Sequence, residues 1–353
     1  MERVVYILGA GFSRPLGLPI MSDFFQKAKD QFAIHPDRYP NFKWIFRRID
    51  DMALIMKYYH SDQFNIEEIL SILEMHDSLA EEENTRPRFL AFIKDVIKHY
   101  SPRMAAPPSG NTSWHNYLAH DDQLRLGYIL FVGNMMGLDI VDDRAHGRDL
   151  PIGLRLGCVL GKRDVRYDVI TMNYDTVLET MAEHLSNSLS GDFRFARAVS
   201  AATDPAPRLA KLHGSVDGDD IVPPTWNKSL HEHIIKEWEC AFNLLSEANH
   251  IRILGYSLPE SDTYIKYLLK AACSRTPNLK SLDVICHDPT GAVARRYSDF
   301  IRFPNWRFFN GTTELYLGQV ADFTRYGGAP SPIVLDKLEV AHETSVRIMS
   351  QPI

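Results

Sequence analysis

The stretch VVYILGAGFS, residues 4–13, decides the fold of this chain. Val4–Leu8 is a continuous apolar, β-branched run of the kind that forms strands buried on both faces of a parallel sheet. Gly9 and Gly11 end that strand, and a helix is expected from about Ser22. Glycines in such a turn permit a positive φ and let backbone N–H groups approach a phosphate. Because the spacing is not a complete GxGxxG, an ordinary strand–helix turn stays open as the alternative.

A second strand is expected over Asp168–Met172, and it ends in the polar triplet 173–175. Asn173 and Asp175 project to the same side, because alternate residues of an extended segment share a face. An amide can hold a water or a sugar hydroxyl, and a carboxylate can steady positive charge that develops on a sugar. The alternative for Asp175 is the N-cap of a helix expected over Thr176–Leu185.

A third strand, over Arg208–Leu212, leads into His213 and Gly214. At the carboxyl end of a strand and next to glycine, this histidine is expected to be exposed to the ligand crevice and not packed in the core. Its ordinary pKa lies near neutrality, so it suits the removal of a proton from a hydroxyl or a water. A lone histidine is more often structural, and the catalytic interpretation depends on its sharing the sheet edge with Asn173.

Two later segments add groups at the same edge. Residues 253–259 have the pattern of a strand, a glycine turn and a helix start, with Ser257 and Glu260 at capping-box spacing. A backbone nest there can take a phosphate or a ribose. Asp288 follows a strand expected over Leu282–Cys286, where an acidic side chain can bind a ribose hydroxyl. The alternative for Asp288 is an ordinary turn residue.

Strand–helix alternation on both sides of a long helical stretch predicts an α/β protein. We expect a Rossmann-like, doubly wound, mostly parallel sheet with an inserted helical subdomain. Strands are also expected over Phe193–Val199 and, as a closing strand pair, over Trp306–Leu317. The expected units are a catalytic domain over 1–34 and 166–328, the inserted helical subdomain over 35–165, and a C-terminal tail over 329–353.

The composition excludes several classes of protein. The chain has 353 residues, of which 45% are hydrophobic and 24% charged, as in ordinary globular enzymes. Its net charge of −6 argues against a dominant nucleic-acid-binding surface. The four cysteines form no CxxC pair, so we expect no zinc ribbon and no metal. No apolar run reaches the roughly 18 residues of a membrane helix, and no signal peptide is apparent, so we expect a cytoplasmic protein.

Together these segments resemble the motifs of the sirtuin superfamily. The resemblance covers about 1–25 and 166–290. At the N-terminus, GAGFS at 9–13 resembles the sirtuin GAGxS loop, and Gly17-Leu18-Pro19 resembles the sirtuin GIP segment. Further along, TMNYD at 171–175 resembles TQNID, and GYSL at 255–258 resembles GTSL. Between these two, Leu212-His213-Gly214 resembles the strand that carries the catalytic histidine of sirtuins.

The chain departs from protein-deacylating sirtuins in three ways. Ile20-Met21-Ser22 stands where deacylases have Asp-Phe-Arg, Met172 replaces a glutamine, and the zinc-ribbon cysteines are missing. Since the acyl-lysine channel of deacylases lies beside that zinc module, these departures favour hydrolysis. Residues 223–226 and 255–260 resemble more closely the prokaryotic sirtuin-like NAD hydrolases of anti-phage defence.

The resemblance implies an NAD+ glycohydrolase (an NAD+ nucleosidase), which cleaves NAD+ to nicotinamide and ADP-ribose without a metal. Asn173 would orient water or ribose, His213 would act as base or ribose-hydroxyl partner, and Asp175 would bind near the nicotinamide. The residues expected to hold NAD are Gly9, Ala10, Gly11, Phe12, Ser13, Pro19, Gly255, Tyr256, Ser257 and Asp288. Two alternatives stay open: an NAD-dependent protein deacylase or ADP-ribosyltransferase, and a non-catalytic sensor of NAD or ADP-ribose.

The resemblance also implies how such an enzyme is controlled. Depletion of NAD kills the host cell, so an NAD-depleting effector of anti-phage defence must be kept off until infection. Control is expected through assembly of a homo-oligomer or through a partner, of which a HerA-type hexameric ATPase is the type implied.

Overall fold

A computed structural model describes most of the chain. The described residues are 1–56, 66, 69–70, 72–73, 75, 85–108, 113–138, 140–141, 148–149, 155–158, 164–198, 200, 204–218, 221–222, 232–260, 262–274, 276–326 and 336–351. Residues 223–226, which carry part of the resemblance, lie outside this set.

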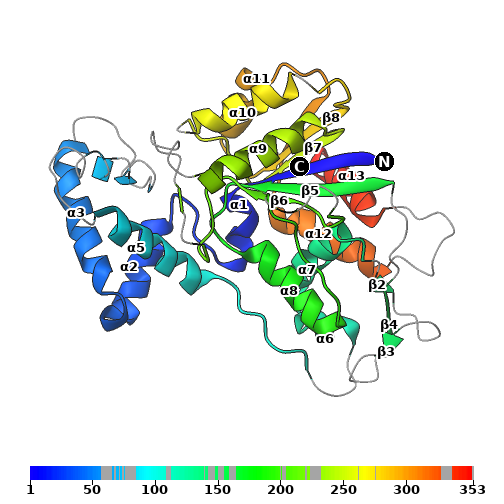
Figure 1. Ribbon diagram of the computed structural model, residues 1–353, viewed down its shortest axis with the longest axis horizontal. Helices are drawn as coiled ribbons and strands as arrows, with labels where there is room; N and C mark the ends of the chain where they lie inside the picture. The colour runs from blue at the N-terminus through cyan, green and yellow to red at the C-terminus, as the bar shows by residue number, and fades with distance from the viewer. Residues whose placement is uncertain are drawn as a thin grey trace.

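A six-stranded parallel sheet forms the centre of the molecule (Figure 1). Its strand order is β6-β5-β1-β7-β8-β9, so the first strand of the chain is central and the order reverses between β1 and β7. This is the order of a doubly wound dinucleotide-binding sheet, and it confirms the predicted fold class. The strands are β1 (Glu2–Leu8), β5 (Val165–Thr171), β6 (Leu209–Lys211), β7 (His250–Leu254), β8 (Ser281–Cys286) and β9 (Trp306–Asn310).

The sequence of β1 explains its central position. Val4, Tyr6 and Leu8 belong to the hydrophobic core on one face of the sheet, whereas Val5 and Ile7 belong to the core on the other. Each of these side chains is at most 2% exposed. An uninterrupted apolar run is what a strand covered on both faces requires, because successive side chains point to opposite faces.

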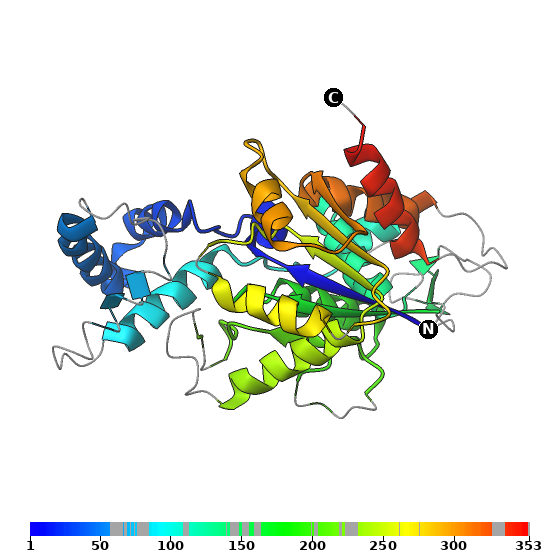
Figure 2. The same ribbon diagram turned by 90° about the horizontal axis from the view of Figure 1, so that it is seen from above.

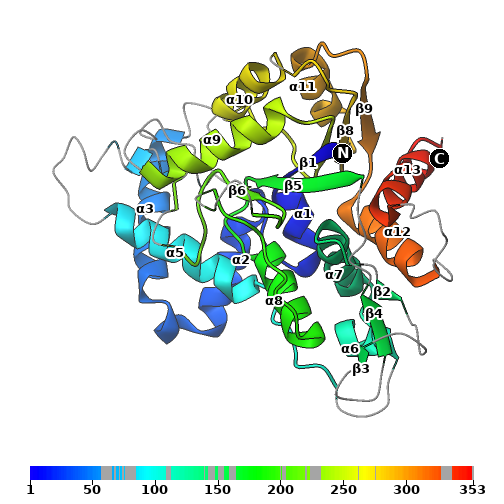
Figure 3. The same ribbon diagram turned by 45° about the vertical axis from the view of Figure 1, so that its right-hand side comes forward.

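Helices cover both faces of the sheet (Figures 1 and 3). On one face pack α7 (Gln123–Met135), α8 (Val177–Leu189), α12 (Thr313–Tyr326) and α13 (Lys337–Met349). On the other face pack α9 (Glu232–Ser246), α10 (Thr263–Cys273) and α11 (Ala292–Phe300). The short helices are α1 (Ala10–Ser13), η1 (Arg14–Leu16), η2 (Pro36–Arg38) and α6 (Trp114–Ala119).

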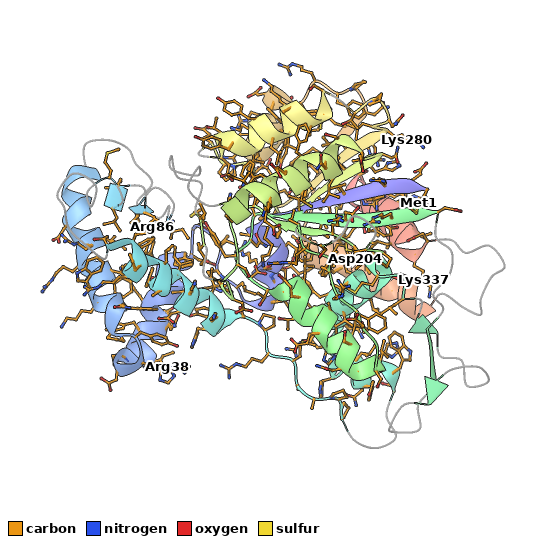
Figure 4. The ribbon with its side chains drawn as sticks, in the orientation of Figure 1. Met1, Arg38, Arg86, Asp204, Lys280 and Lys337 are labelled. Atoms are coloured by element: carbon orange, nitrogen blue, oxygen red, sulfur yellow. The ribbon has the colours of Figure 1, made fainter. Side chains whose placement is uncertain are left out.

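Three helices, one before and two within the inserted stretch, form an arm beyond the carboxyl end of the sheet (Figure 2). They are α2 (Phe24–Ile34), α3 (Pro40–Met56) and α5 (Thr85–Tyr100). Stacked and edge-to-face rings join them, with Phe92 within 6.1 Å of both Phe25 and Phe42 between ring centroids. In Figure 4, Arg38 and Arg86 mark this arm, and Met1 and Lys280 lie at the opposite end of the sheet.

The rest of the inserted stretch is not part of the arm. Helix α7 packs along the sheet domain against α12 and α8. A small antiparallel sheet of β2 (Ile140–Val141), β4 (Arg155–Cys158) and β3 (Arg148–Asp149) follows it, where only helices were expected. The domain boundaries predicted from the sequence stay a prediction.

Two of the expected strand segments are wrong. Over the described residues 193–198 only Ala196 forms a bridge, with Arg208, and at Phe193 the Ser186 hydroxyl takes both backbone groups at 2.9 Å; Val199 lies outside the described residues. The expected strand pair over Trp306–Leu317 is a single strand, β9, followed by α12. Apolar residues at Leu317 and Val320 onward have helical spacing, and they pack α12 against α7.

The C-terminal stretch, predicted as a tail, carries a helix that is docked by a buried polar network. Arg252 of β7 donates two hydrogen bonds to the Glu339 carboxylate, at 2.9 and 2.5 Å, and one to the Tyr6 hydroxyl at 2.9 Å. His342, which is fully buried, lies with Nε2 3.1 Å from the Asp283 carboxylate. The network fixes α13 to the strands of the sheet, since breaking a buried ion pair is costly.

Candidate active site

The loops after β1 and β7 touch at the carboxyl edge of the sheet. The Gly9 N–H donates to the Leu254 carbonyl at 3.1 Å, and the Gly11 N–H donates to the Gly255 carbonyl at 2.9 Å. A Cβ on Gly11 would lie 2.7 Å from the Gly255 oxygen, so a side chain there would force the loops apart. Gly255 has φ +63°, which favours glycine. The strand order reverses between β1 and β7, and ligands of doubly wound sheets bind at this point.

Gly9 and Gly11 were expected to let backbone N–H groups approach a phosphate, but in the structure they allow two loops to pack closely. Gly9 has φ −104°, and Gly11 is not among the described residues of positive φ. Their N–H groups are bonded to backbone carbonyls of the β7 loop and do not point at a phosphate. The helix that follows, α1, is four residues long. These glycines serve close packing of two loops, and their contact with a cofactor stays a prediction.

Asn173 links the end of β5 to the loop after β1. Its amide nitrogen donates to the Gly9 carbonyl at 3.0 Å and to the Ser13 hydroxyl at 3.1 Å. Because a carbonyl only accepts, these contacts fix the orientation of the amide group. The backbone N–H of Asn173 donates to the Thr171 hydroxyl, and the residue is 8% exposed. With both amide hydrogens committed, Asn173 can offer a ligand only its carbonyl oxygen, as an acceptor.

Asp175 lies beside Asn173 and is half-buried. One carboxylate oxygen accepts the Val177 N–H at 3.1 Å, so the capping interpretation of Asp175 at the start of α8 is present in the structure. Burial raises the pKa of the Asp175 carboxyl, whereas the nearby Lys211 ammonium and the Ser13 hydroxyl oppose that rise. Lys211 is 1% exposed and donates to the Asp175 carbonyl and to Glu179. A fixed cation thus lies under the site.

His213 follows β6, as expected, but its side chain is 2% exposed and not open to solvent. Its ring packs against that of Tyr174 at 5.8 Å between centroids, and its carbonyl accepts the Val222 N–H at 3.0 Å. Gly214, at φ +80°, turns the chain away immediately afterwards. The histidine is therefore held in place by an aromatic neighbour and by the turn that follows it.

These residues surround one cavity of about 820 Å³, within the range of small-molecule sites. Of the expected site residues, nine line it: Ala10, Gly11, Pro19, Asn173, Asp175, His213, Gly255, Tyr256 and Ser257. They come from the ends of β1, β5, β6 and β7. The strand order alone explains why segments more than 200 residues apart meet here.

Four expected site residues are not among those that line the cavity. Gly9 and Ser13 stand behind Asn173 as its hydrogen-bond partners. Phe12 is 1% exposed and packs against Tyr128 at 5.1 Å between ring centroids. Asp288 accepts the Ala294 N–H at 2.9 Å.

The surroundings of Asp288 explain its orientation. Burial would raise the pKa of this carboxyl, but the backbone N–H groups at the start of α11 lower it below its usual value. Asp288 thus caps a helix in this structure, and its binding of a ribose hydroxyl stays a prediction.

The loop after β7 is held under strain. Leu258 has φ +49° and precedes Pro259, although residues before proline favour extended conformations. The Tyr256 hydroxyl donates to Asp262 at 2.5 Å, and the Tyr256 carbonyl accepts from the Tyr297 hydroxyl at 2.8 Å. These buried contacts fix a backbone that the local sequence disfavours, which is common at ligand sites.

Sequence reasoning missed about two-thirds of the residues that line the cavity. The start of α12 contributes Gly311, Thr312, Thr313 and Glu314, and Arg14 lies at the end of α1. Residues 311–314 directly follow a strand of the parallel sheet, as Gly255 does, so their position after a strand could have indicated that they line the site. The predicted strand pair over Trp306–Leu317 instead placed these residues within the sheet.

The arm supplies another part of the wall, which is apolar. Phe24 of α2 and Ile97 of α5 line the cavity, and so does Ile66, which lies between α3 and α5 in the sequence. The Lys94 ammonium donates to the Gly218 carbonyl at 2.7 Å, so α5 also touches the loop that follows His213. Helical periodicity predicted these apolar faces but gave no reason to place them at the sheet edge.

With this geometry established, comparison with known proteins points to one family. Residues 168–299 match the family model described as SIR2-like domain. This match supports the sirtuin superfamily. It covers β5 to α11 and includes Asn173, Asp175, His213 and Gly255. A comparison with curated proteins gives no match.

Several solved structures similar to this chain are sirtuins by their descriptions. One, from work on the structural basis of sirtuin substrate affinity, has 14% identity, a TM-score of 0.39, and coverage of 90% of this chain and 93% of that chain. Another, Sir2 with a p53 peptide and NAD+, has 14% identity, a TM-score of 0.32, and coverage of 91% and 90%. At these TM-scores no residue of this chain is equated with a sirtuin residue.

Two further observations concern the described residues alone. Among them, no group of three histidine, cysteine, aspartate or glutamate side chains could hold a metal ion. Within the same part of the chain, every helix is too short or too polar to cross a membrane.

Proposed function

We propose that this protein is an NAD+ glycohydrolase, which cleaves NAD+ to nicotinamide and ADP-ribose. The observation that carries the proposal is the fixed orientation of Asn173, with both amide hydrogens bound and only its carbonyl oxygen left for a ligand. His213 and Asp175 line the same cavity. The SIR2-like match over 168–299 supports an NAD-utilising enzyme.

The reaction breaks the bond between ribose C1′ and the nicotinamide nitrogen. Nicotinamide leaves with the bonding electron pair and becomes neutral, and C1′ acquires oxocarbenium character. A water oxygen bonds to C1′ and loses one proton, so the products are nicotinamide, ADP-ribose and a proton. No oxidant or metal is needed for this balance.

Three side chains have distinct roles in this proposal. The carbonyl oxygen of Asn173 accepts a hydrogen bond from the attacking water or from a ribose hydroxyl, which orients it toward C1′. His213 receives the proton. Asp175 binds near the nicotinamide, and in its ionised form it steadies the positive charge on the sugar.

The apolar part of the cavity wall favours hydrolysis of a small molecule. Phe24 and Ile97 of the arm, together with Ile66, form this part of the wall. Such a wall excludes bulk water and strengthens the electrostatic effect of the groups inside. The missing zinc-ribbon cysteines favour the same conclusion.

A direct assay separates the candidate reactions. Purified protein is incubated with NAD+ in the presence and absence of an acyl-lysine peptide, and the products are identified by chromatography and mass spectrometry. We expect equal amounts of nicotinamide and ADP-ribose without peptide. Nicotinamide release that requires the peptide would establish a deacylase instead, and binding of NAD+ without turnover would establish a sensor.

We further propose that the protein is an NAD-depleting effector of anti-phage defence. The resemblance to the defence enzymes supports this, as does the need to restrain an activity that would kill the cell. Control would then come from a homo-oligomer or from a HerA-type hexameric ATPase. Light scattering and NAD+ turnover are measured together over a concentration series, with and without such an ATPase. Full activity of an isolated monomer would refute this mode of control.

A further inference from the structure

Arg14 lines the cavity, and among the described residues none accepts a hydrogen bond from its side chain. It follows Ser13 directly, caps the end of α1, and is exposed while lining the cavity. Among the described residues that line the cavity, it is the one arginine or lysine. Within the described part of the chain, no carboxylate lies within ion-pair distance of its guanidinium.

Among the described residues that line the cavity, no other lysine or arginine offers a positive charge to an anionic ligand, and the buried Lys211 ammonium behind the wall is bonded to Asp175 and Glu179. The carboxylates of Asp175, Asp262 and Glu314 line it, and like charges repel a phosphate. The N–H groups of Gly9 and Gly11 are bonded to the β7 loop. Helix α1 is too short to offer a significant dipole. A dinucleotide carries two negative charges on its pyrophosphate, and a cation in the wall would favour its binding here.

The backbone of Arg14 is held well enough for this purpose. Pro15 follows it within the turn η1, and Gly17 ends that turn at φ +95°. The Lys27 ammonium of α2 donates to the Gly17 carbonyl at 2.5 Å, which ties the turn to the arm. These contacts fix the backbone from which the Arg14 side chain projects, while the exposed guanidinium stays able to turn toward a ligand in the cavity.

We propose that Arg14 binds the pyrophosphate of the dinucleotide and makes the site selective for dinucleotides over nucleosides. The inference rests on the proposed function for the identity of the ligand. A planar guanidinium can donate two parallel hydrogen bonds to the oxygens of a phosphate group, and its positive charge strengthens both bonds. Arg14 acts in binding and not in the bond-breaking step.

Binding of ADP-ribose and of adenosine by calorimetry tests the proposal. Arg14→Ala should weaken ADP-ribose binding about 10- to 100-fold, as expected for charge-assisted hydrogen bonds, and change adenosine binding less than about 2-fold. Arg14→Lys should recover part of the affinity, and added salt should weaken the wild type more than Arg14→Ala. The matched control is Arg38→Ala, on the arm in Figure 4, which should bind both ligands normally.

Turnover of NAD+ supplies a second measurement. Arg14→Ala should raise KM by a similar factor and leave kcat within about 2-fold. An equal loss for ADP-ribose and adenosine, or no loss for either, would overturn the proposal. If wild-type protein binds ADP-ribose in the predicted Arg14-dependent way but never releases nicotinamide, the proposed function fails and the role of Arg14 stands.

Discussion

Asn173 is unlike an ordinary polar residue at a strand end, because its amide group joins two strands. Its hydrogens reach Gly9 and Ser13, which belong to the loop after β1, while its backbone continues β5. The sequence predicted that an amide would lie at this edge. It did not predict which end of the amide would face a ligand, since that depends on contacts with residues 160 or more positions away.

We predict that Asn173→Ala lowers the rate of nicotinamide release at least about 100-fold, because it removes the acceptor that orients the nucleophile. The midpoint of thermal unfolding is measured alongside, to show that the protein remains folded. Ser13→Ala is the matched control, since it removes one partner of the amide and leaves the acceptor; a loss of about 10-fold or less is expected. Equal losses in the two variants would mean that the effect is structural.

At the scale of elements, the contact between the loops after β1 and β7 builds the site. The two loops approach so closely that Gly11 and Gly255 exclude any side chain. The sequence showed both glycines but indicated contact with a ligand and not with each other. Close approach of two loops distant in sequence depends on the order of strands, which no local pattern specifies.

We expect Gly11→Ala to disrupt this contact. The new Cβ would lie 2.7 Å from the Gly255 oxygen and 2.9 Å from its Cα, and backbone atoms on both sides cannot yield. The free energy of unfolding should fall by about 1–3 kcal/mol, with loss of NAD+ turnover. Urea unfolding measures it. The control is Gly318→Ala, in α12 with no atom within 4 Å, which should stabilise the protein by up to about 1 kcal/mol. Similar behaviour of the two variants would contradict the packing role.

The docking of α13 predicts a pH dependence of stability. Burial and the Arg252 charge lower the pKa of His342 to about 4, against the ordinary 6.5, although the Asp283 carboxylate opposes this. Below pH 6.5 the unfolded chain binds a proton that the folded one does not. The contribution of His342 is therefore complete above pH 6.5 and is lost as the pH falls toward 4, by up to about 3 kcal/mol.

The check compares wild type with His342→Gln by urea unfolding between pH 7.5 and 4.5. The variant should be less stable at pH 7.5 but should lose less stability on acidification. Asp283 does not interfere in this window, because hydrogen bonds from His342 and Arg307 outweigh its burial and lower its pKa to about 2. Parallel pH profiles for the two proteins would disprove the neutral, buried state of His342.

At the scale of the whole molecule, the apolar strands and the alternation with helices were enough to predict the doubly wound sheet. The prediction of a strand pair at the closing segment is wrong, because only Trp306–Asn310 is rich in strand-forming residues and the apolar residues after Thr313 have helical spacing. The arm was predicted as helices, but its position beyond the sheet, where Phe24 and Ile97 enclose the site, depends on tertiary packing. The periodicity of a sequence indicates which face of a helix or strand is apolar, but it does not indicate which distant elements that face packs against.

The cavity, the fixed amide of Asn173 and the nearby His213 support the central proposal, that this molecule hydrolyses NAD+. The most direct test incubates NAD+ with purified wild-type protein, Asn173→Ala and His213→Ala, each alone over a concentration series and with a HerA-type ATPase, and quantifies nicotinamide and ADP-ribose. The account predicts equal amounts of both products with wild type under at least one condition, and none above background with either variant. Intact NAD+ under every condition, or equal turnover by wild type and both variants, would contradict it.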